Sequence, residues 1–452
     1  MTSPPSGERS IRILGFSILC YLLLPKSAVA EKSIVKTNDY EVYTDGRVGG
    51  FLSYTRGDGL PRAFSTPDGM ILHDVAGGGV EGAAERQVVP GTTPAQLTQG
   101  TIENFRIRSG FIGNTLGLGV RTPIDETTTI TGYIQIWTYI EGTGRRKAVP
   151  VYPDARQGYL KVQGLWGSVL VGRARALFSR GATDIDAMYA HRYGVGFPGQ
   201  TGVDNTGPTL GHIGYGVLGS GFAGTIQYAT PVLVGLQLTA GLFDPVNLQG
   251  AWTRTKYPRP EAELTFDQAI GTSGKVVLFG NGAWQKLYRE DSPQSDYAGG
   301  FGYGGRFEIG PVHLGAAGHY GRGLGLNYAL EPSDATLDAN GTLRKFDGYY
   351  VQSQVVLGTV DLSAGWGMTR VFLNPEDNIP LCGGNPCTGA PGEMPSIPHS
   401  VVKSQTGISA GVVWHITPAL HYDFDYFRAQ VRWFLGEKQN VNFFNTGLTY
   451  TW

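Results

Sequence analysis

Charged side chains in alternating segments are the first residues of this sequence whose type and spacing could have a chemical role. Arg47 stands beside Val48, and Arg106 and Arg108 flank Ile107, so each segment places arginine on one face and apolar residues on the other. Fixed charges of this kind break no bonds. On one face of a strand they can attract, repel or orient charged and polar groups, which is a binding or positioning role and not catalysis.

The histidines and serines form no catalytic arrangement. His313, His319, His415 and His421 are scattered, and none has an evident serine partner. The sequence has no Gly-x-Ser-x-Gly elbow, no His-Glu-x-x-His motif and no phosphate-binding loop. We therefore expect no enzymatic activity and no cofactor.

Two cysteines stand close together in Cys-Gly-Gly-Asn-Pro-Cys, at Cys382 and Cys387. Two cysteines with no histidine nearby cannot complete a zinc site, although the spacing leaves a metal knuckle as an alternative. Because the chain carries an export signal, we expect these cysteines to form a disulfide that stiffens a loop.

That export signal occupies residues 1–30. It has basic residues, an apolar run of about a dozen residues that is too short to span a bilayer, and the small-x-small site Ala28-Val29-Ala30. Residues 31–452 show no linker and no change in composition, which predicts one domain. The net charge of the whole chain is close to zero, so no nucleic-acid partner is expected.

Alternation continues to the last residue, and abundant glycine is accompanied by many aromatic residues and few Met or Cys, a mixture that favours β structure over helices. In 233–242 apolar residues alternate with Gly, Gln and Thr, and 444–452 repeats the pattern. We expect sixteen strands, at 41–55, 103–121, 127–141, 155–163, 167–175, 212–229, 233–243, 259–268, 274–289, 297–309, 311–324, 345–357, 359–371, 401–415, 419–433 and 439–452. In 419–433 the apolar parity changes, which suggests a bulge near Tyr426.

The connections between these segments alternate between short and long. Gly310-Pro311 and Gly358 are tight turns, whereas 56–102 and 176–211 are long. Such alternation is typical of a transmembrane antiparallel β-barrel with periplasmic turns, extracellular loops and an even number of strands. The predicted fold class is therefore all-β.

Several segments resemble the general-diffusion porins of the Gram-negative outer membrane. The stretch 130–137 resembles the family's third strand, 154–161 its fourth, and 167–173 the strand before its inward-folded third loop. The chain also ends on an aromatic residue, although Trp452 stands where phenylalanine is usual. The family's Pro-Glu-Phe-Gly-Gly is replaced by residues 184–189, and His212 is the nearest candidate for a wall arginine on 212–229.

The resemblance implies a pore constriction. Arg47, Arg108 and Arg156 match the family's basic cluster, and Asp184 and Asp186 match the acids of its third loop. Three further arginines would extend the cluster: Arg106, Arg173 and Arg175.

We therefore expect an outer-membrane porin through which ions and small hydrophilic solutes diffuse passively. A channel selective for anions or sugars and an adhesion or structural barrel that acts through its loops remain alternatives. Expected partners are the solutes, outer-membrane lipid and lipopolysaccharide. The external triplet Arg145-Arg146-Lys147 is either a contact for lipopolysaccharide phosphates or a solvated run of charges. The resemblance also implies a homotrimer.

Overall fold

A computed structural model describes most of the chain. The described residues are 31–58, 101–109, 112–138, 154–188, 211–248, 252, 255–290, 292–330, 336–338, 341–375, 381–382, 385–386, 402–434, 436 and 438–452. The expected signal peptide at 1–30 and the basic triplet at 145–147 lie outside them.

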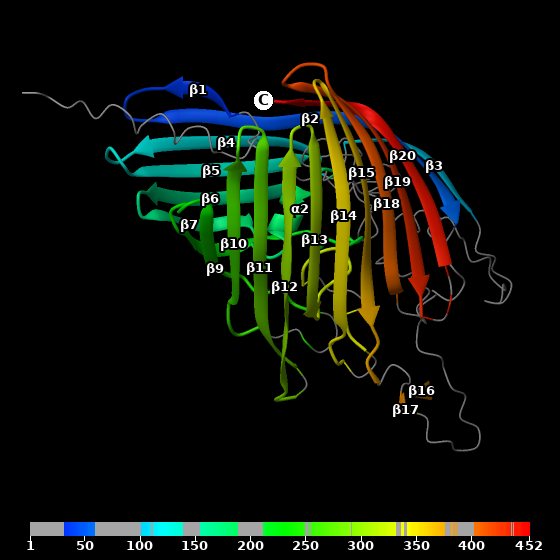
Figure 1. Ribbon diagram of the computed structural model, residues 1–452. Helices are drawn as coiled ribbons and strands as arrows, with labels where there is room; N and C mark the ends of the chain where they lie inside the picture. Colours follow the sequence, from blue (N-terminus) through cyan, green and yellow to red (C-terminus); the bar gives the residue numbers. More distant parts are fainter. Residues whose placement is uncertain are drawn as a thin grey trace, which may run out of the picture.

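Sixteen antiparallel strand positions form a closed barrel (Figure 1), which confirms the predicted fold class and strand number. In chain order they are β2 (Glu41–Asp58), β3 (Thr101–Arg108) with β4 (Asn114–Pro123), β5 (Thr129–Thr138), β6 (Asp154–Gly164), β7 (Gly167–Arg175), β8 (Phe222–Ala229), β9 (Leu236–Phe243), β10 (Arg259–Ile270), β11 (Gly274–Tyr288), β12 (Ser295–Ile309), β13 (Val312–Arg322), β14 (Lys345–Leu357), β15 (Val360–Phe372), β18 (Val402–His415), β19 (Leu420–Trp433) and β20 (Lys438–Thr451).

The barrel closes where β2 pairs with β20, from Arg47 opposite Thr451 to Gly57 opposite Val441. A short additional strand, β1 (Lys32–Lys36), pairs with the first residues of β2 beyond the point where β20 ends. The expected strand list did not include β1.

β3 and β4 share one wall position but are separated by a break. β3 pairs with the second half of β2 and β4 with its first half. Across the break, the residues that pair with inward positions of β2 change from even-numbered, such as Arg108, to odd-numbered, such as Thr115. The single strand expected at 103–121 therefore changes parity in its middle.

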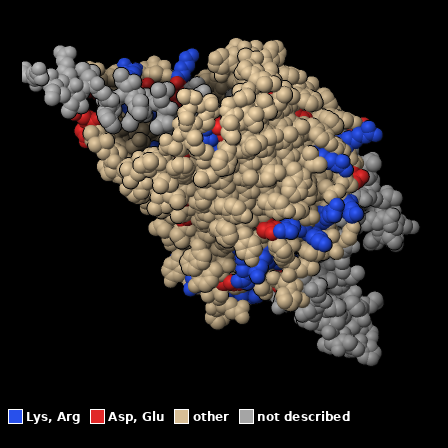
Figure 2. All heavy atoms as spheres, in the orientation of Figure 1, with Lys and Arg blue, Asp and Glu red and all other residues tan. Residues whose placement is uncertain are grey.

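The side chains alternate between the interior and the outer surface. Leu116, Leu118 and Val120 of β4 are exposed on the outer face, whereas Tyr43 and Phe51 of β2 are buried on the inner face. Figure 2 shows a broad face almost free of charge, with lysine, arginine and acidic residues gathered towards its edges. An outer face of this kind suits a lipid environment bounded by water on both sides.

Short turns and longer connections alternate around the barrel, and the longer ones hold further structure. The helix α2 (Arg180–Ile185) follows β7 and packs on β11, β12 and β13. Two short strands, β16 (Leu381–Cys382) and β17 (Asn385–Pro386), pair with each other in the connection after β15. Cys387 lies outside the described residues, so the expected disulfide stays a prediction.

None of the helices in the described part of the chain is long and apolar enough to cross a membrane.

An apolar core fills part of the interior near the strand ends that lead to the longer connections. Leu287, Phe346 and Trp433 contribute from the wall, and Phe178 and Leu218 contribute from the segment that follows β7. All five side chains are almost completely buried. The segment after β7 is thus held against the inner wall by hydrophobic burial as well as by hydrogen bonds.

Two strand predictions were wrong in detail. Residues 212–221 are not the start of a strand but belong to the inward segment that leads into β8. The bulge near Tyr426 does not exist, because β19 keeps an unbroken register with β20. From Phe427 onward the apolar residues of β19 face the interior and the polar ones face outward. Phe427 and Trp433 belong to interior apolar clusters, and Arg428 is exposed on the outer face.

Candidate pore constriction

The segment after β7 turns into the barrel, and we call its described parts, 176–188 and 211–221, the inward loop. Two buried acids of β10 hold its first part. Glu261 accepts hydrogen bonds from the amides of Leu177 (2.7 Å) and Phe178 (2.9 Å). Glu263 accepts one from the amide of Gly181 at the start of α2 (3.0 Å) and forms an ion pair with Arg180. The first backbone amides of a helix have no acceptor within the helix, and these two acids accept hydrogen bonds from amides at and just before the start of α2.

The other end of α2 is held by β14. The Tyr350 hydroxyl donates to the Ala182 carbonyl oxygen (2.9 Å). The Gln352 amide donates to the Ile185 carbonyl (2.6 Å) and accepts from the Ala187 amide (2.9 Å). The helix is therefore fixed to opposite parts of one continuous wall, from β10 to β14.

Asp186 joins the two parts of the inward loop and does not reach solvent. Its carboxylate accepts hydrogen bonds from the amides of Met188 (2.9 Å) and His212 (2.7 Å), and it lies 3.2 Å from Nδ1 of the His212 ring. That ring stacks on Tyr350, with centroids 4.6 Å apart. Because Asp186 and His212 are both completely buried, the structure gives them a role in holding the loop.

Asp184 differs from Asp186 because its side chain is exposed. Its Oδ1 lies 2.6 Å from Nη1 of Arg175, whose Nε also donates to the Ser220 hydroxyl at 2.6 Å. Arg175 therefore links the end of β7 to both parts of the inward loop. Asp184 is the acid of the expected pair that reaches water.

The expected arginines occupy different places. Arg47 is buried on the inner face of β2, and the backbones of Arg106 and Arg108 pair with the inward residues Ser53 and Phe51. Arg173 pairs with Gly158 and shares the outward, exposed face of β7 with Val171, which differs from the sequence expectation.

Arg156 reaches the interior through a bulge that the sequence did not reveal. The register between β5 and β6 shifts at this residue, since Gln157 pairs with Gln135 and Ala155 with Ile136. The guanidinium lies over Trp137, 4.7 Å from the ring centroid, and forms an ion pair with Asp154 at 2.6 Å. The ring and the carboxylate together fix the position of this charge.

A second group of inward residues was missed by the sequence analysis, and we call it the tyrosine–cation wall. Its members are Tyr43, Arg121, Tyr133, Tyr159 and Lys161. The register places Arg121 and Lys161 on either side of Thr131 in one row and the three tyrosines in the next row. The centroids of Tyr133 and Tyr159 lie 5.3 Å apart, and Arg121 lies 4.5 Å above the ring of Tyr43.

The two cations of this wall differ in their partners. Arg121 forms ion pairs with Glu31 (2.9 Å) and Glu41 (3.3 Å). Lys161 has no hydrogen bond or ion pair to any residue that the structure describes. The charged group nearest in effect is Arg121, which is also positive and repels it. With respect to the described residues, Lys161 is therefore a cation on the inner wall without a fixed counter-ion.

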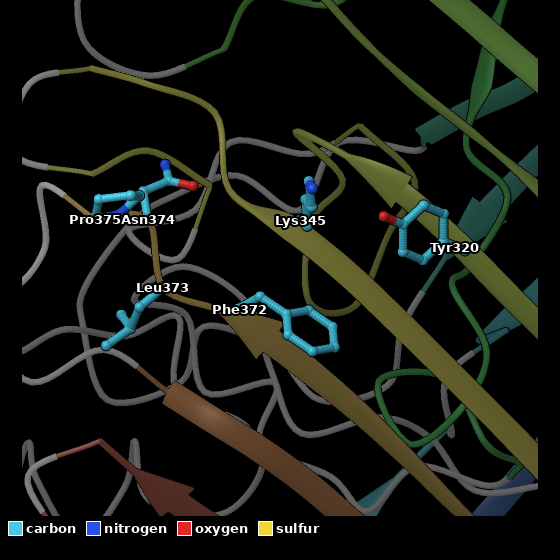
Figure 3. A pocket seen from close by; sticks show the side chains of 6 residues that line it. All are labelled: Tyr320, Lys345, Phe372, Leu373, Asn374 and Pro375. Atoms are coloured by element: carbon cyan, nitrogen blue, oxygen red, sulfur yellow. The ribbon is translucent and has the colours of Figure 1, made fainter.

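A pocket of about 390 Å³ lies elsewhere, on the outer side of the barrel where β13, β14 and β15 meet their longer connections (Figure 3). Tyr320, Lys345 and Phe372 line it, and all three stand at outward positions of their strands. It combines aromatic rings with one cation and is separate from the inward loop. Within the described ranges, no three His, Cys, Asp or Glu side chains form a metal-binding group.

Comparisons with known proteins agree with this geometry. Residues 91–452 match a family model described as Gram-negative porin. The outer membrane channel DcaP of Acinetobacter baumannii is 14% identical, with a TM-score of 0.59 over 92% of this chain and 99% of that chain. The anion-selective porin from Comamonas acidovorans is 12% identical, with a TM-score of 0.55 over 92% of this chain and 100% of that chain.

OmpF of Salmonella typhi, in a complex with daunomycin, is 11% identical, with a TM-score of 0.52 over 93% of this chain and 100% of that chain. At these identities the similarity concerns the fold alone. No curated protein sequence matches the chain.

Proposed function

The chain belongs to the Gram-negative porin family, and we propose that its channel passes small anions more readily than cations. The family and the closed barrel make the protein an outer-membrane channel for the passive diffusion of ions and small hydrophilic solutes. Both point to a channel and not to an enzyme.

The observation that supports the anion preference is the charge of Lys161, which no described residue neutralises. Of the exposed acids near the inward loop, Asp154 is paired with Arg156 and Asp184 with Arg175. Lys161 has no such partner among the described residues. In a lumen bounded by low-dielectric walls, an uncompensated charge acts on passing ions more strongly than the same charge on an open surface.

Single-channel recording in a planar bilayer under a KCl gradient tests this proposal. Lys161→Gln should move the reversal potential towards cations, and Lys161→Glu should move it further. Lys286→Gln is the matched control, because Lys286 stands at an outward position of β11 and interacts with Tyr288 and Tyr297. Equal reversal potentials for the wild type and both Lys161 variants at low salt would refute the assignment. Near 1 M salt the difference should shrink, because the Debye length falls to about 3 Å.

We also propose that the constriction lies between the inward loop and the wall that carries Arg47 and Arg156, with Arg106 and Arg108 as further members. Support comes from the inward position of Arg47, from the bulge that turns Arg156 inward, and from the exposure of Asp184 on the loop. A field between loop and wall would orient polar solutes as they pass. To test this placement, Arg156→Cys and Asp184→Cys should each react with a water-soluble thiol reagent, and the attached label should lower the single-channel conductance.

Lipopolysaccharide is the lipid partner that we propose, in contact with four exposed cations at outward positions of the closing strands: Arg56, Arg428, Arg432 and Lys438. Arg428 and Arg56 lie on either side of Asn442 in one row, and Arg432 is opposite Lys438 in another. Tyr54, Tyr426 and Phe444 form an aromatic cluster beside them. Cations above aromatic residues suit the phosphates of a lipid headgroup at the membrane surface.

For assembly we propose a homotrimer, with a smooth outer patch on β5 and β6 as the contact. Gly132 and Gly158 both face outward, and nothing lies within 4 Å of a Cβ added to either. Flat surfaces without protruding side chains allow close approach of another subunit. Mass measurement in mild detergent should give three chains for the wild type and one chain for Gly158→Trp, whereas a monomeric wild type would refute the proposal.

A further inference from the structure

Four oxygen-bearing side chains are buried together on the inner face where the barrel closes. Asp423 and Asp425 belong to β19, Asn445 belongs to β20 and Ser53 belongs to β2. Their exposed fractions are 1%, 5%, 1% and 1%. This set, which we call the closing-strand oxygen cluster, shares no residue with the inward-loop anchors or with the tyrosine–cation wall, although Ser53 and Tyr43 both belong to β2.

The strand register brings these residues next to one another. Asp425 is directly opposite Asn445, and Asn445 is directly opposite Ser53, so the three form one row across β19, β20 and β2. Side chains in directly opposite positions on one face have Cβ atoms about 5 Å apart. Asp423 is two residues before Asp425 on the same face, and its Oδ2 lies 3.4 Å from the Thr449 hydroxyl.

Polar atoms of this cluster have no partner in the described structure, although all are shielded from solvent. They are Oδ1 of Asp423, Oδ2 of Asp425, both amide atoms of Asn445 and the hydroxyl of Ser53. Elsewhere on the inner wall the buried acids are satisfied: Glu263 holds Arg180 and Gly181, and Asp45 accepts from the Tyr133 hydroxyl. Burying polar groups without partners is unfavourable, so the cluster needs a ligand that the protein itself does not supply.

Charge and donor chemistry identify the class of that ligand. The positive charge of Arg47 acts on Asp423. The charge that acts on Asp425 is the negative charge of Asp423. The cluster thus contains two carboxylates, only one of which is acted on by an arginine, and its other oxygen atoms belong to an amide and a hydroxyl. These are oxygen ligands of the kind that Ca²⁺ binds, with water able to complete its coordination. Mg²⁺ fits less well because it requires near-ideal octahedral geometry.

We propose that the closing-strand oxygen cluster binds a Ca²⁺ ion that ties the last two strands of the barrel to the first. The side chains of Asp423, Asp425, Asn445 and Ser53 supply the protein ligands. Met188 of the inward loop lies beside one end of the cluster, because a Cβ added at Gly411 would meet both Asp425 (2.9 Å) and Met188 (2.9 Å). The ion thus stabilises the seam of the barrel and is not a transported solute.

Terbium luminescence tests the proposal on the full mature chain refolded in detergent without lipopolysaccharide. Tb³⁺ should bind with emission sensitised by nearby tyrosine, and Ca²⁺ should displace it. Asp425→Asn should weaken binding at least tenfold. Asp45→Asn is the matched control, since Asp45 is also inward and buried but has the Tyr133 hydroxyl as its partner; it should bind Tb³⁺ as the wild type does.

A second measurement keeps the proposal open to refutation if Asp425→Asn does not fold. Ca²⁺ should raise the midpoint of the heat-induced mobility change in the wild type, and Ser53→Ala, which loses one neutral ligand, should need several-fold more Ca²⁺ for the same rise. Two results overturn the site. One is a wild type with no emission and no Ca²⁺-dependent rise, and the other is undiminished Tb³⁺ binding in Asp425→Asn or an unchanged Ca²⁺ requirement in Ser53→Ala.

Discussion

The wall from β10 to β14 and the tyrosine–cation wall from β2 to β6 use glycine in the same way for different occupants. On the first wall and on the adjacent strand β15, inward glycines leave space for the inward loop. For example, a Cβ added at Gly367 of β15 would meet the carbonyl oxygen of Tyr215. On the second wall, a Cβ added at Gly119 would meet the ring of Tyr43, so the glycine makes room for a side chain of the adjacent strand. One wall is therefore covered by the inward loop, and the other is covered by its own aromatic and cationic side chains.

The comparison predicts that the wall from β10 to β14 contributes more to the free energy of unfolding, and that the tyrosine–cation wall contributes more to ion selectivity. Removing an anchor of the inward loop should therefore have the largest effect. Glu263→Ala leaves Arg180 and the amide of Gly181 without their acceptor and should lower the free energy of unfolding by about 3 kcal/mol. Denaturant unfolding measures this loss, and single-channel traces should show more current noise as the loop loosens.

Glu308→Gln is the control for that variant, because Glu308 pairs with Arg306 on β12 and is more exposed than Glu263. Its loss should cost at most about 1 kcal/mol. Equal destabilisation by the two substitutions would remove the distinction between an anchoring acid and an ordinary wall acid.

The next largest effect should come from overpacking the tyrosine–cation wall. Gly119→Ala forces the ring of Tyr43 to move and should cost about 1–3 kcal/mol. Gly132→Ala is the matched control, since Gly132 lies on the adjacent strand but faces outward with nothing within 4 Å of an added Cβ. Unfolding midpoints that fall equally in both variants would show that the strand backbone, and not the ring, is sensitive.

Asp184 and Asp186 allow the comparison to be sharpened within the inward loop itself. Asp186→Asn weakens the hydrogen bonds that join the two parts of the loop and should destabilise the protein by about 1–3 kcal/mol. Asp184→Asn should leave stability within about 1 kcal/mol, because its ion pair is exposed to water, and should move the reversal potential towards anions. A large stability loss in Asp184→Asn, or a larger reversal-potential shift in Asp186→Asn, would contradict these roles.

The smallest effect should come from the turn that joins β4 to β5. The amide and hydroxyl of Thr127 and the amide of Thr128 donate to Asp125 and hold the pKa of that carboxyl below its ordinary value. A lowered pKa contributes stability that is present above the unfolded pKa and is lost as the pH falls through the folded pKa. Asp125→Asn should remove this pH-dependent contribution to the free energy of unfolding. Denaturant unfolding measured at pH values below the folded pKa and above the unfolded pKa of Asp125 checks this. Parallel pH profiles of wild type and variant would contradict it.

Much of the barrel could be predicted from the sequence because strands signal themselves locally. Val48, Gly50, Leu52 and Tyr54 occupy every second position of the first strand, and short turns separate many of the strands. The strand number and closure followed from these patterns together with the alternation of connection lengths.

The constriction could be predicted only in part, because its details depend on contacts between distant residues. Asp184 and Asp186 look alike in the sequence, and only the contact with His212 shows that Asp186 is buried. Arg121 was missed because the break between β3 and β4 reverses the parity of the strand that contains it. The break includes Gly113, which has a φ of 59°, and reading 103–121 as one strand across this glycine assigns the wrong face to the residues that follow it.

The pairing of β2 with β20 also has a consequence for folding kinetics. Asp58 and Asn440, which share a hydrogen bond at this junction, are 382 positions apart in the sequence. Contacts between such distant residues require the largest loss of chain entropy before they form, so the junction must close after the hairpins between neighbouring strands. Until then β2 and β20 both present unpaired backbone edges, which are prone to aggregation. The rate of barrel assembly should therefore depend on how long these two edges are kept from other chains.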